Sequence, residues 1–257
     1  MILNLITCNI RFSNPADGVH AWEHRRDFLV STLLKHDPDI ICTQEGRYDQ
    51  LKELESNLEN YILLDDHRSW IKERMYPSIF LKKNVFEVLK SEDLWLSETP
   101  DVAGSFSFES AFPRLMTWTK LQPINSTKNL FVVDTHLDHV KSETRLGQVK
   151  VLSQEIKRTW KHDSELIIMG DFNDSPESAV RKQLVDSFPD LVDTWKKFNH
   201  IEETSHHAFK GEMQNGARID WIMIQDKVQI ISSVMDKSVN NGIYPTDHFP
   251  IICKIRL

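Results

Sequence analysis

Short apolar runs that alternate with amphipathic stretches restrict the fold of this chain more than any other feature of its sequence. The runs with the length and composition of β-strands are 2–6, 39–44, 78–81, 130–136, 165–170, 218–224 and 250–255. Between them, apolar residues recur every three or four positions, as in amphipathic helices, over 22–34, 48–58 and 143–160. Strands and helices alternate in both halves, which predicts an α/β architecture.

Two local signals refine this prediction. The middle of the chain, 85–121, is richer in strand signals, and its segment "RLMTWTKL" (114–121) combines aromatic residues with threonine. This composition favours sheets that contain antiparallel pairs. The triplet Ser175-Pro176-Glu177 is typical of an N-cap followed by proline at the first helical position, so we expect a helix to begin there.

Charge and cysteine content narrow the class of protein. The formal charge is −7 and no run of Lys or Arg stands out, which weakens an assignment to long duplex DNA. Cys8, Cys42 and Cys253 each lie in an apolar segment without CxxC spacing, so we expect buried, reduced thiols. The N-terminus lacks the features of a signal peptide, and no apolar run approaches the roughly 20 residues of a membrane span. We therefore expect a soluble cytoplasmic protein.

Polar residues terminate most of the predicted strands. In "LIIMGDFNDSPES" (166–178) an apolar strand runs directly into Asp171, Asn173 and Asp174. Other strand ends carry Asn9, Gln44, Glu45, His136, Asp138, Asp220, Asp247 and His248. Charged and amide groups at the edge of an apolar core cost free energy unless they are paired. Strand ends are also where α/β folds place their chemistry, so we expect these groups to converge on one polar cleft.

The residue types in this cleft point to metal-assisted hydrolysis. The potential hard oxygen ligands, which suit Mg²⁺ or Mn²⁺, are Asn9, Glu45, Asp171, Asn173 and Asp247. On an extended backbone Asp171 and Asn173 face the same side and can hold one water. His136 and His248 can contact a phosphate, and Asp220 could orient His248. Without a Ser or Cys nucleophile, this set favours direct attack of water on a phosphoester.

Each of these residues also has a structural interpretation. Residues 171–174 could form a helix-capping turn, Asp220 could pair with Arg218, and His136 and His139 could be histidines whose hydrogen bonds are satisfied within the fold. The predicted site would be wrong only if all of these structural interpretations were correct at once, so we prefer the prediction of a hydrolytic site.

Two further groups were weighed as binding elements. His206 and His207, with His200 nearby, could suggest a transition-metal tract, but their surroundings favour a solvated loop. Phe106 and Phe108 lie in a segment rich in Gly and Ser, and they are the preferred aromatic candidates for a substrate-binding wall.

An ordered series of motifs gives the chain a family resemblance. The motifs are "TCNIR" (7–11), "TQE" (43–45), "PRLMTW" (113–118), "THLDH" (135–139), "GDFND" (170–174), "RIDWI" (218–222) and "TDHFP" (246–250). In this order they resemble the endonuclease/exonuclease/phosphatase superfamily, which is DNase I-like, near its Nocturnin-like deadenylase branch. The resemblance implies a four-layer α/β/β/α sandwich with two mixed β-sheets packed face to face, forming a single catalytic domain over 1–257.

The resemblance also implies a role for each residue of the cleft. Asn9, Glu45 and Asp247 fall on metal-site positions, with Glu45 as the principal ligand. His136 and Asn173 fall on positions that contact the phosphate, and Asp171 on the residue that activates water. Asp220 falls on the residue that orients His248, which is itself a phosphate ligand. Arg114 is a candidate substrate contact, although a structural ion pair is an equal alternative.

The implied activity is that of a Mg²⁺-dependent phosphoester hydrolase, with Mn²⁺ as a possible substitute. A phosphodiesterase or nuclease is the preferred form, and the negative charge permits a short single-stranded nucleic acid or a nucleotide as substrate. A phosphomonoesterase acting on inositol phosphates or similar molecules is the first alternative. A non-catalytic binding module on the same scaffold is the second. The sequence indicates no obligate protein partner.

Overall fold

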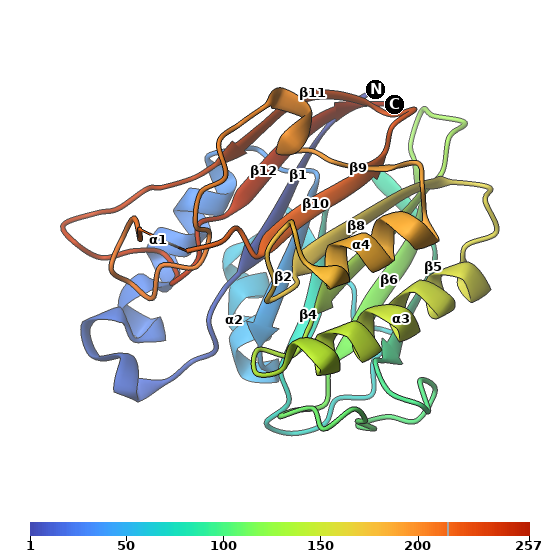
Figure 1. Cartoon of the computed structure of the whole chain (residues 1–257). Coiled ribbons are helices and arrows are strands. Elements are labelled where there is room, and N and C mark those ends of the chain that lie inside the picture. The colour runs from blue at the N-terminus through green and yellow to red at the C-terminus, as the bar shows by residue number, and fades with distance from the viewer. Residues whose placement is uncertain (215) are drawn as a thin grey trace.

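The architecture is two six-stranded mixed β-sheets flanked by helices (Figure 1). It was obtained as a computed structural model that describes residues 1–214 and 216–257. Short 3₁₀ helices, η1 (Pro15–His20) and η2 (Lys196–Phe198), lie in the connections. None of the helices in these two ranges has the length and apolar character needed to cross a lipid bilayer.

The first sheet has the strand order β11-β12-β1-β2-β4-β3. Its pairs are antiparallel except for β1 and β2, which run parallel. The strands are β1 (Ile2–Asn9), β2 (Ile40–Gly46), β3 (Tyr61–Leu63), β4 (Tyr76–Lys82), β11 (Gln229–Met235) and β12 (Ile251–Arg256). The helices packed on its outer face are α1 (Trp22–Leu34) and α2 (Tyr48–Asn57).

The second sheet has the order β5-β6-β7-β8-β10-β9. Among the described residues of this sheet, β7 and β8 are the one parallel pair. The strands β5 and β6, from the middle of the chain, pair antiparallel, as expected. The strands are β5 (Phe86–Trp95), β6 (Leu115–Pro123), β7 (Leu130–His136), β8 (Glu165–Asp171), β9 (Leu191–Asp193) and β10 (Asp220–Gln225). The helices on its outer face are α3 (Ser142–Thr159) and α4 (Ala179–Ser187).

Three apolar clusters hold these layers together and confirm the predicted four-layer sandwich. The central cluster joins the inner faces of the two sheets, where Leu5 and Ile251 pack in the same core as Val132 and Ile222. A second cluster lies between the second sheet and helices α3 and α4, and a third between the first sheet and helices α1 and α2. A strand such as β8 is therefore buried on both faces, which explains its uninterrupted apolar sequence.

Two other expectations have clear outcomes. The three cysteines are buried and free, as predicted. The helix expected to begin at Ser175 begins instead at Ala179, because Ser178 is the N-cap and its hydroxyl accepts a hydrogen bond from Arg181 N at 3.3 Å. Ser175 and Pro176 belong to the preceding turn.

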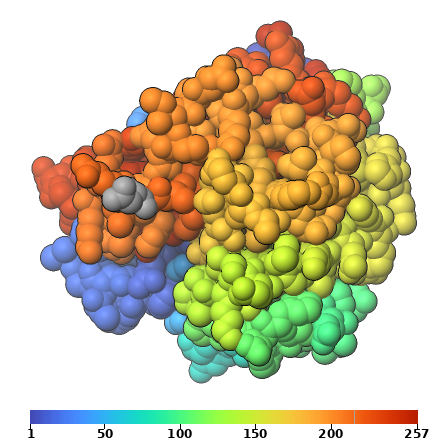
Figure 2. Space-filling view, in the orientation of Figure 1, coloured from blue at the N-terminus to red at the C-terminus, as the bar shows by residue number. Residues whose placement is uncertain are grey.

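Chain segments that are distant in sequence meet on one face of the molecule. Figure 2 shows the N-terminal segment, in blue, beside the orange segment that precedes β10. His20 of η1 stacks on Phe209 of that segment with ring centroids 4.5 Å apart. The buried Arg25 of α1 donates to the carbonyl oxygens of Ile10 and Pro245 at 2.8 and 3.1 Å. These contacts tie the first helix to the loop that leads into β12.

A buried arginine links the two sheets through polar contacts. Arg68 donates to Asp93 of β5 at 2.7 Å, to Thr117 of β6 at 2.8 Å and to Ser78 of β4 at 2.9 Å. Its side chain is fully buried. Burial opposes a charge on Asp93, but the Arg68 guanidinium holds the pKa of that carboxyl well below its usual range. The pair is therefore ionised at neutral pH.

Removing Asp93 should leave the Arg68 charge buried without its partner. We expect Asp93→Ala to lower the free energy of unfolding by about 3–5 kcal/mol at pH 7. Because the pKa of Asp93 is depressed in the folded state, this stabilisation is complete above the unfolded value near 4 and is lost as pH falls below it. Urea denaturation at pH 7 and at pH 3 measures both effects. The exposed Asp101, which pairs with Arg158, provides a control in which neither should appear.

Candidate active site

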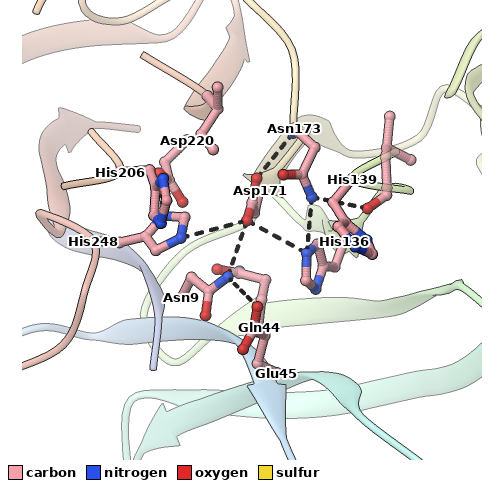
Figure 3. A network of polar contacts seen from close by, with 12 residues as sticks. Asn9, Gln44, Glu45, His136, His139, Asp171, Asn173, His206, Asp220 and His248 are labelled. Atoms are coloured by element: carbon pink, nitrogen blue, oxygen red, sulfur yellow. Dashed lines mark hydrogen bonds and ion pairs between the residues drawn. The ribbon is translucent and has the colours of Figure 1, made fainter. Parts of the chain in front are cut away.

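The polar strand ends converge on one cleft, to which both sheets contribute (Figure 3). Asn9 ends β1 of the first sheet, and Asp171 ends β8 of the second. The Asn9 amide Nδ2 donates to Asp171 Oδ2 at 2.9 Å and to Glu45 Oε1 at 3.2 Å. Its Oδ1 accepts from the backbone N–H of Arg11 at 2.9 Å, which fixes the orientation of the amide. One asparagine thus bridges two carboxylates across the sandwich.

An irregularity in β2 positions Glu45. The pairing of β2 with β4 shifts register between Thr43 and Gly46, and Glu45 has a φ of 69°. A non-glycine residue in the left-handed region carries strain, and such residues cluster at functional sites. Glu45 Oε2 accepts from the backbone N–H of Phe12 at 3.1 Å, so both carboxylate oxygens are held from the β1 side.

Gly170 allows Asp171 to reach the cleft from a parallel strand pair. Its φ is 145°, and a Cβ atom at this position would lie 2.1 Å from the carbonyl oxygen of Thr135 on β7. Only glycine fits this close approach of two backbones. The register pairs His136 with Asp171 at the next position, which places both side chains at the same edge of the sheet.

The expected extended geometry of Asp171 and Asn173 is wrong in detail. Asn173 has a φ of 50°, and its backbone N–H donates to Asp171 Oδ1 at 2.9 Å, so the two residues form a tight turn. The turn still directs the Asn173 amide into the cleft, where Nδ2 donates to Leu137 O and lies 3.0 Å from His136 Nε2. The neighbouring Asp174 pairs instead with Arg145 at 2.9 Å. Asp171 is therefore part of the cleft, whereas Asp174 is structural.

Asp220 contacts His248 as expected. Its Oδ2 lies 2.8 Å from His248 Nδ1. The alternative pairing with Arg218 does not occur, because Arg218 pairs with Asp193 and Glu202. Burial disfavours a charge on His248, but the Asp220 carboxylate raises the pKa of the ring to about 10. His248 is therefore charged at neutral pH, and its Nε2 lies 3.9 Å from Asp171 Oδ2.

The remaining groups around Asp171 differ in charge. Burial, together with the nearby Asp220, raises the pKa of Asp171 to about 7. Burial and the neighbouring Arg114 lower the pKa of His136 well below its usual value, so this ring is neutral. Because Arg114 Nη1 can only donate, His136 Nδ1 accepts its bond of 2.8 Å. His136 Nε2 lies 3.4 Å from Asp171 Oδ2 and 3.0 Å from the Asn173 amide Nδ2.

Arg114 forms no structural ion pair. No carboxylate of the described residues lies within 4.0 Å of its guanidinium, which instead contacts the rings of His136 and His139. It is buried, and it lines a cavity of about 460 Å³ together with the acids and histidines of the site.

Two aromatic walls flank this cavity. In the Phe12 wall, the guanidinium carbons of Arg11 and Arg47 lie 4.4 and 4.7 Å from the ring centroid of Phe12. In the Phe112 wall, the ring of Phe112 stacks on His139 at 5.9 Å, and Arg114 lies 5.9 Å from its centroid.

The predicted wall residues Phe106 and Phe108 do not line this cavity. Phe106 is exposed, and Phe108 packs against the α3 side of the second sheet. The Gly/Ser-rich segment that carries them packs beside α3, where the Thr144 hydroxyl donates to the carbonyl oxygen of Phe108 at 2.6 Å. The cavity walls instead come from segments adjoining β1, β2 and β6.

The histidines expected in a solvated loop are also placed differently. His206 pairs with His248 through an isolated antiparallel β-bridge, and the two ring centroids are 4.7 Å apart inside the cleft. His207 is fully buried and stacks on Phe249 at 4.0 Å. The positions of His206 and His207 follow from the pairing of His206 with His248, and no local pattern in the sequence predicts this long-range pairing. His200 lies elsewhere, with Nε2 2.9 Å from the carbonyl oxygen of Ser233.

The donor set fits a divalent cation. Glu45, Asp171 and Asp247 line the cavity, and Asp220 lies behind His248, so a dication bound there would be surrounded by negative charge. Among the described residues, ligand atoms come within 4.8 Å of one another in two groups, Asp171–Asp220–His248 and His206–Asp247–His248. Glu45 belongs to neither group, and its assignment as a metal ligand, like that of Asn9, stays a prediction.

The fold and the cleft define a class of protein, the phosphoester hydrolases built on a two-sheet sandwich. The chain belongs to the endonuclease/exonuclease/phosphatase family, because the model of that family matches residues 6–248. Members of this family are phosphoester hydrolases, and this chain is one of them.

Individual relatives are distant in sequence and close in fold. The chain is 22% identical to uncharacterized protein L388 of Acanthamoeba polyphaga mimivirus over 94% of each chain. It is 23% identical to Nocturnin of Drosophila melanogaster, of which it spans 42%. A crystal structure of an endonuclease/exonuclease/phosphatase from Bacteroides vulgatus has a TM-score of 0.91 at 25% identity, over 100% of this chain and 99% of that one. The Bacteroides thetaiotaomicron mannosyl-6-phosphatase Bt3783 has a TM-score of 0.85 at 23% identity, over 99% of this chain and 100% of that one.

The charge on His248 should depend on Asp220. We expect Asp220→Asn to lower the pKa of His248 from about 10 towards the ordinary histidine value near 6.5. The folded pKa is raised, so the stabilisation from this pair is complete below pH ~6.5 and is lost as pH rises through about 10. An NMR titration of the His248 ring measures the shift. Asp226→Asn, at an exposed acid paired with Lys197, is the control. An unchanged His248 titration in Asp220→Asn would contradict the assigned role.

Proposed function

We propose that this protein is a divalent-metal-dependent phosphodiesterase that cleaves its substrate by direct attack of water. The observation that carries the proposal is that the acids and histidines line one cavity together with the Phe12 wall and the Phe112 wall. A phosphodiester has a group on each side of the scissile phosphate, and each wall offers an aromatic ring and a guanidinium to one such group.

Asp171 is the proposed general base. It is almost fully buried, and the backbone N–H of Asn173 and the amide of Asn9 hold its two oxygens in place. Its pKa of about 7 suits proton transfer near neutral pH, since a base is most effective when its pKa lies near the operating pH. The Asn173 amide, held by Leu137 O, lies beside this base and would orient the attacking water.

His248 and Arg114 are the proposed stabilisers of the transition state. Both carry positive charge into the cavity, and Asp220 fixes the His248 ring so that Nε2 faces the reaction centre. His136 is neutral, and its ring lies beside Asp171 in the same region. Preorganised donors aimed at developing negative charge typically account for a large share of enzymatic rate acceleration.

A divalent cation, when bound, would polarise the scissile phosphate and offset its charge. Glu45, helped by Asn9 and Asp247, would hold it, because carboxylate and amide oxygens are the ligands that Mg²⁺ and Mn²⁺ prefer. The side chain of Glu45 is fixed by the amide of Asn9 and the backbone of Phe12, so this carboxylate is preorganised for the ion.

Phosphomonoester hydrolysis is the second candidate. Four arginines line the cavity, Arg11, Arg47, Arg74 and Arg114, and such a set would also suit the double negative charge of a monoester. Assays of matched diesters and monoesters, bis(p-nitrophenyl) phosphate against p-nitrophenyl phosphate and a dinucleotide against a mononucleotide, distinguish the two activities.

Asp171→Asn tests the proposed base. We expect a loss of about 10²–10⁴-fold in kcat, or roughly 3–5 kcal/mol of transition-state stabilisation, with the fold intact. Chelation should abolish hydrolysis by the wild type, and Mg²⁺ or Mn²⁺ should restore it. Asp174→Asn removes an acid of the same turn that pairs with Arg145, and it should retain most of the activity. Near-full kcat in Asp171→Asn with Mg²⁺ would exclude Asp171 as the base.

The pH profile should show two limbs. Activity requires Asp171 without its proton and His248 with its proton, so kcat/KM should rise through about 7 and fall towards 10. A bound dication lowers the pKa of Asp171 and moves the acid limb to lower pH. Asp220→Asn should move the alkaline limb to lower pH, because it removes the carboxylate that keeps His248 charged. An alkaline limb that stays in place would assign it to another group.

A further inference from the structure

We propose that His206, Asp247 and His248 form a binding site for a transition-metal dication such as Zn²⁺, at the edge of the catalytic cavity. The geometry of the site stands on its own. Its effect on catalysis, which is inhibition, rests on the proposed function.

Three ligand atoms already lie close together at this point. One atom from each residue falls within 4.8 Å of the other two, and His206 Nε2 lies 3.8 Å from Asp247 Oδ2. The backbone bridge between His206 and His248 holds the two rings side by side, with centroids 4.7 Å apart (Figure 3). Small side-chain adjustments bring such a group to the 2.0–2.2 Å ligand distances of zinc.

The hydrogen bonds around this group identify the ligand atoms. His248 Nδ1 is engaged with Asp220 at 2.8 Å, so Nε2 is the ligand atom, and zinc binding there must displace its proton. A carboxylate behind a metal-binding histidine is the usual outer partner of zinc ligands. The Thr246 hydroxyl lies 3.3 Å from Asp247 Oδ1, and Asp247 Oδ2 lies 3.8 Å from His206 Nε2 and 4.0 Å from Arg11 Nε, an ion pair that a bound metal would replace.

The donor types select the class of metal. Two imidazole nitrogens and one carboxylate suit Zn²⁺ or Co²⁺, whereas Mg²⁺ prefers an all-oxygen set. His206 lines the cavity and its side chain is about 44% exposed, so an incoming ion and a fourth ligand, water or phosphate, can reach the site. The carboxylates of Asp171, Asp220 and Asp247 surround His248 and offset the charge of a dication.

Occupation of this site has a consequence for catalysis. His248 Nε2 is the atom that faces Asp171 and, in the proposed mechanism, the substrate phosphate. A metal bound through Nε2 removes that donor and also takes Asp247 from the predicted Mg²⁺ site. Zinc should therefore inhibit hydrolysis that is supported by Mg²⁺.

Direct metal binding is the primary test. Wild type, His206→Ala and His200→Ala are titrated with Zn²⁺ against a chromophoric chelator in excess Mg²⁺, and with Co²⁺ by visible absorption. His200 contacts Ser233 and Trp195 outside the cavity, so it is the matched control. We expect one zinc site in wild type and in His200→Ala, and a loss of affinity of about tenfold or more in His206→Ala. The cobalt spectrum of a site with nitrogen ligands should disappear in the same variant.

Inhibition is the second readout. The zinc concentration that halves hydrolysis of bis(p-nitrophenyl) phosphate in saturating Mg²⁺ should rise by about tenfold or more in His206→Ala and stay unchanged in His200→Ala. Equal zinc affinity in wild type and His206→Ala, or no zinc binding by wild type, overturns the proposal. If no variant hydrolyses any phosphoester but zinc binding still depends on His206, the site stands and the proposed function fails.

Discussion

The hydrogen bond from Asn9 Nδ2 to Asp171 Oδ2 joins the two sheets where their strands end. The arrangement of the other side chains in the cleft depends on the same alignment of the two sheets. Similar polar contacts lie deeper between the sheets, where Asp134 of β7 accepts from Gln44 and Ser78 of the first sheet at 2.6 and 2.9 Å. The groups proposed for catalysis come from both sheets, and they meet only if the sheets pack in one relative position. The apolar core brings the sheets together, and these directional bonds select one alignment among many that would bury similar area.

Much of the fold could be read from the sequence because the central strands are covered on both faces. β1, β7, β8 and β10 therefore appear as continuous apolar segments, and their polar ends mark the cleft. The dyad of Asp220 and His248 was also accessible, since an acid inside an apolar strand requires a partner. Short or exposed strands such as β3, β9 and β11 lack this signal, because edge positions tolerate mixed composition.

The parts that the sequence did not predict depend on long-range packing of loops. Phe12 becomes a cavity wall only because the β1 loop places it beside Arg47, which follows β2. His206 and His207 enter the core region through pairing with the segment around His248. The observed start of α4 differs from the predicted start by a few residues for another reason. Ser175 and Ser178 are both suitable caps, and tertiary contacts decide between them.

At Glu45, the residue that would best suit the left-handed backbone differs from the residue that the proposed chemistry requires. At a φ of 69°, glycine or asparagine would have a lower conformational energy than glutamate, so the bulge at Glu45 stores backbone strain beneath the cleft. Sequence optimisation aimed only at thermal resistance would favour replacing this glutamate, and the proposed metal ligand would then be lost. Tolerance to heating is thus a poor guide to whether an engineered descendant of this chain still works.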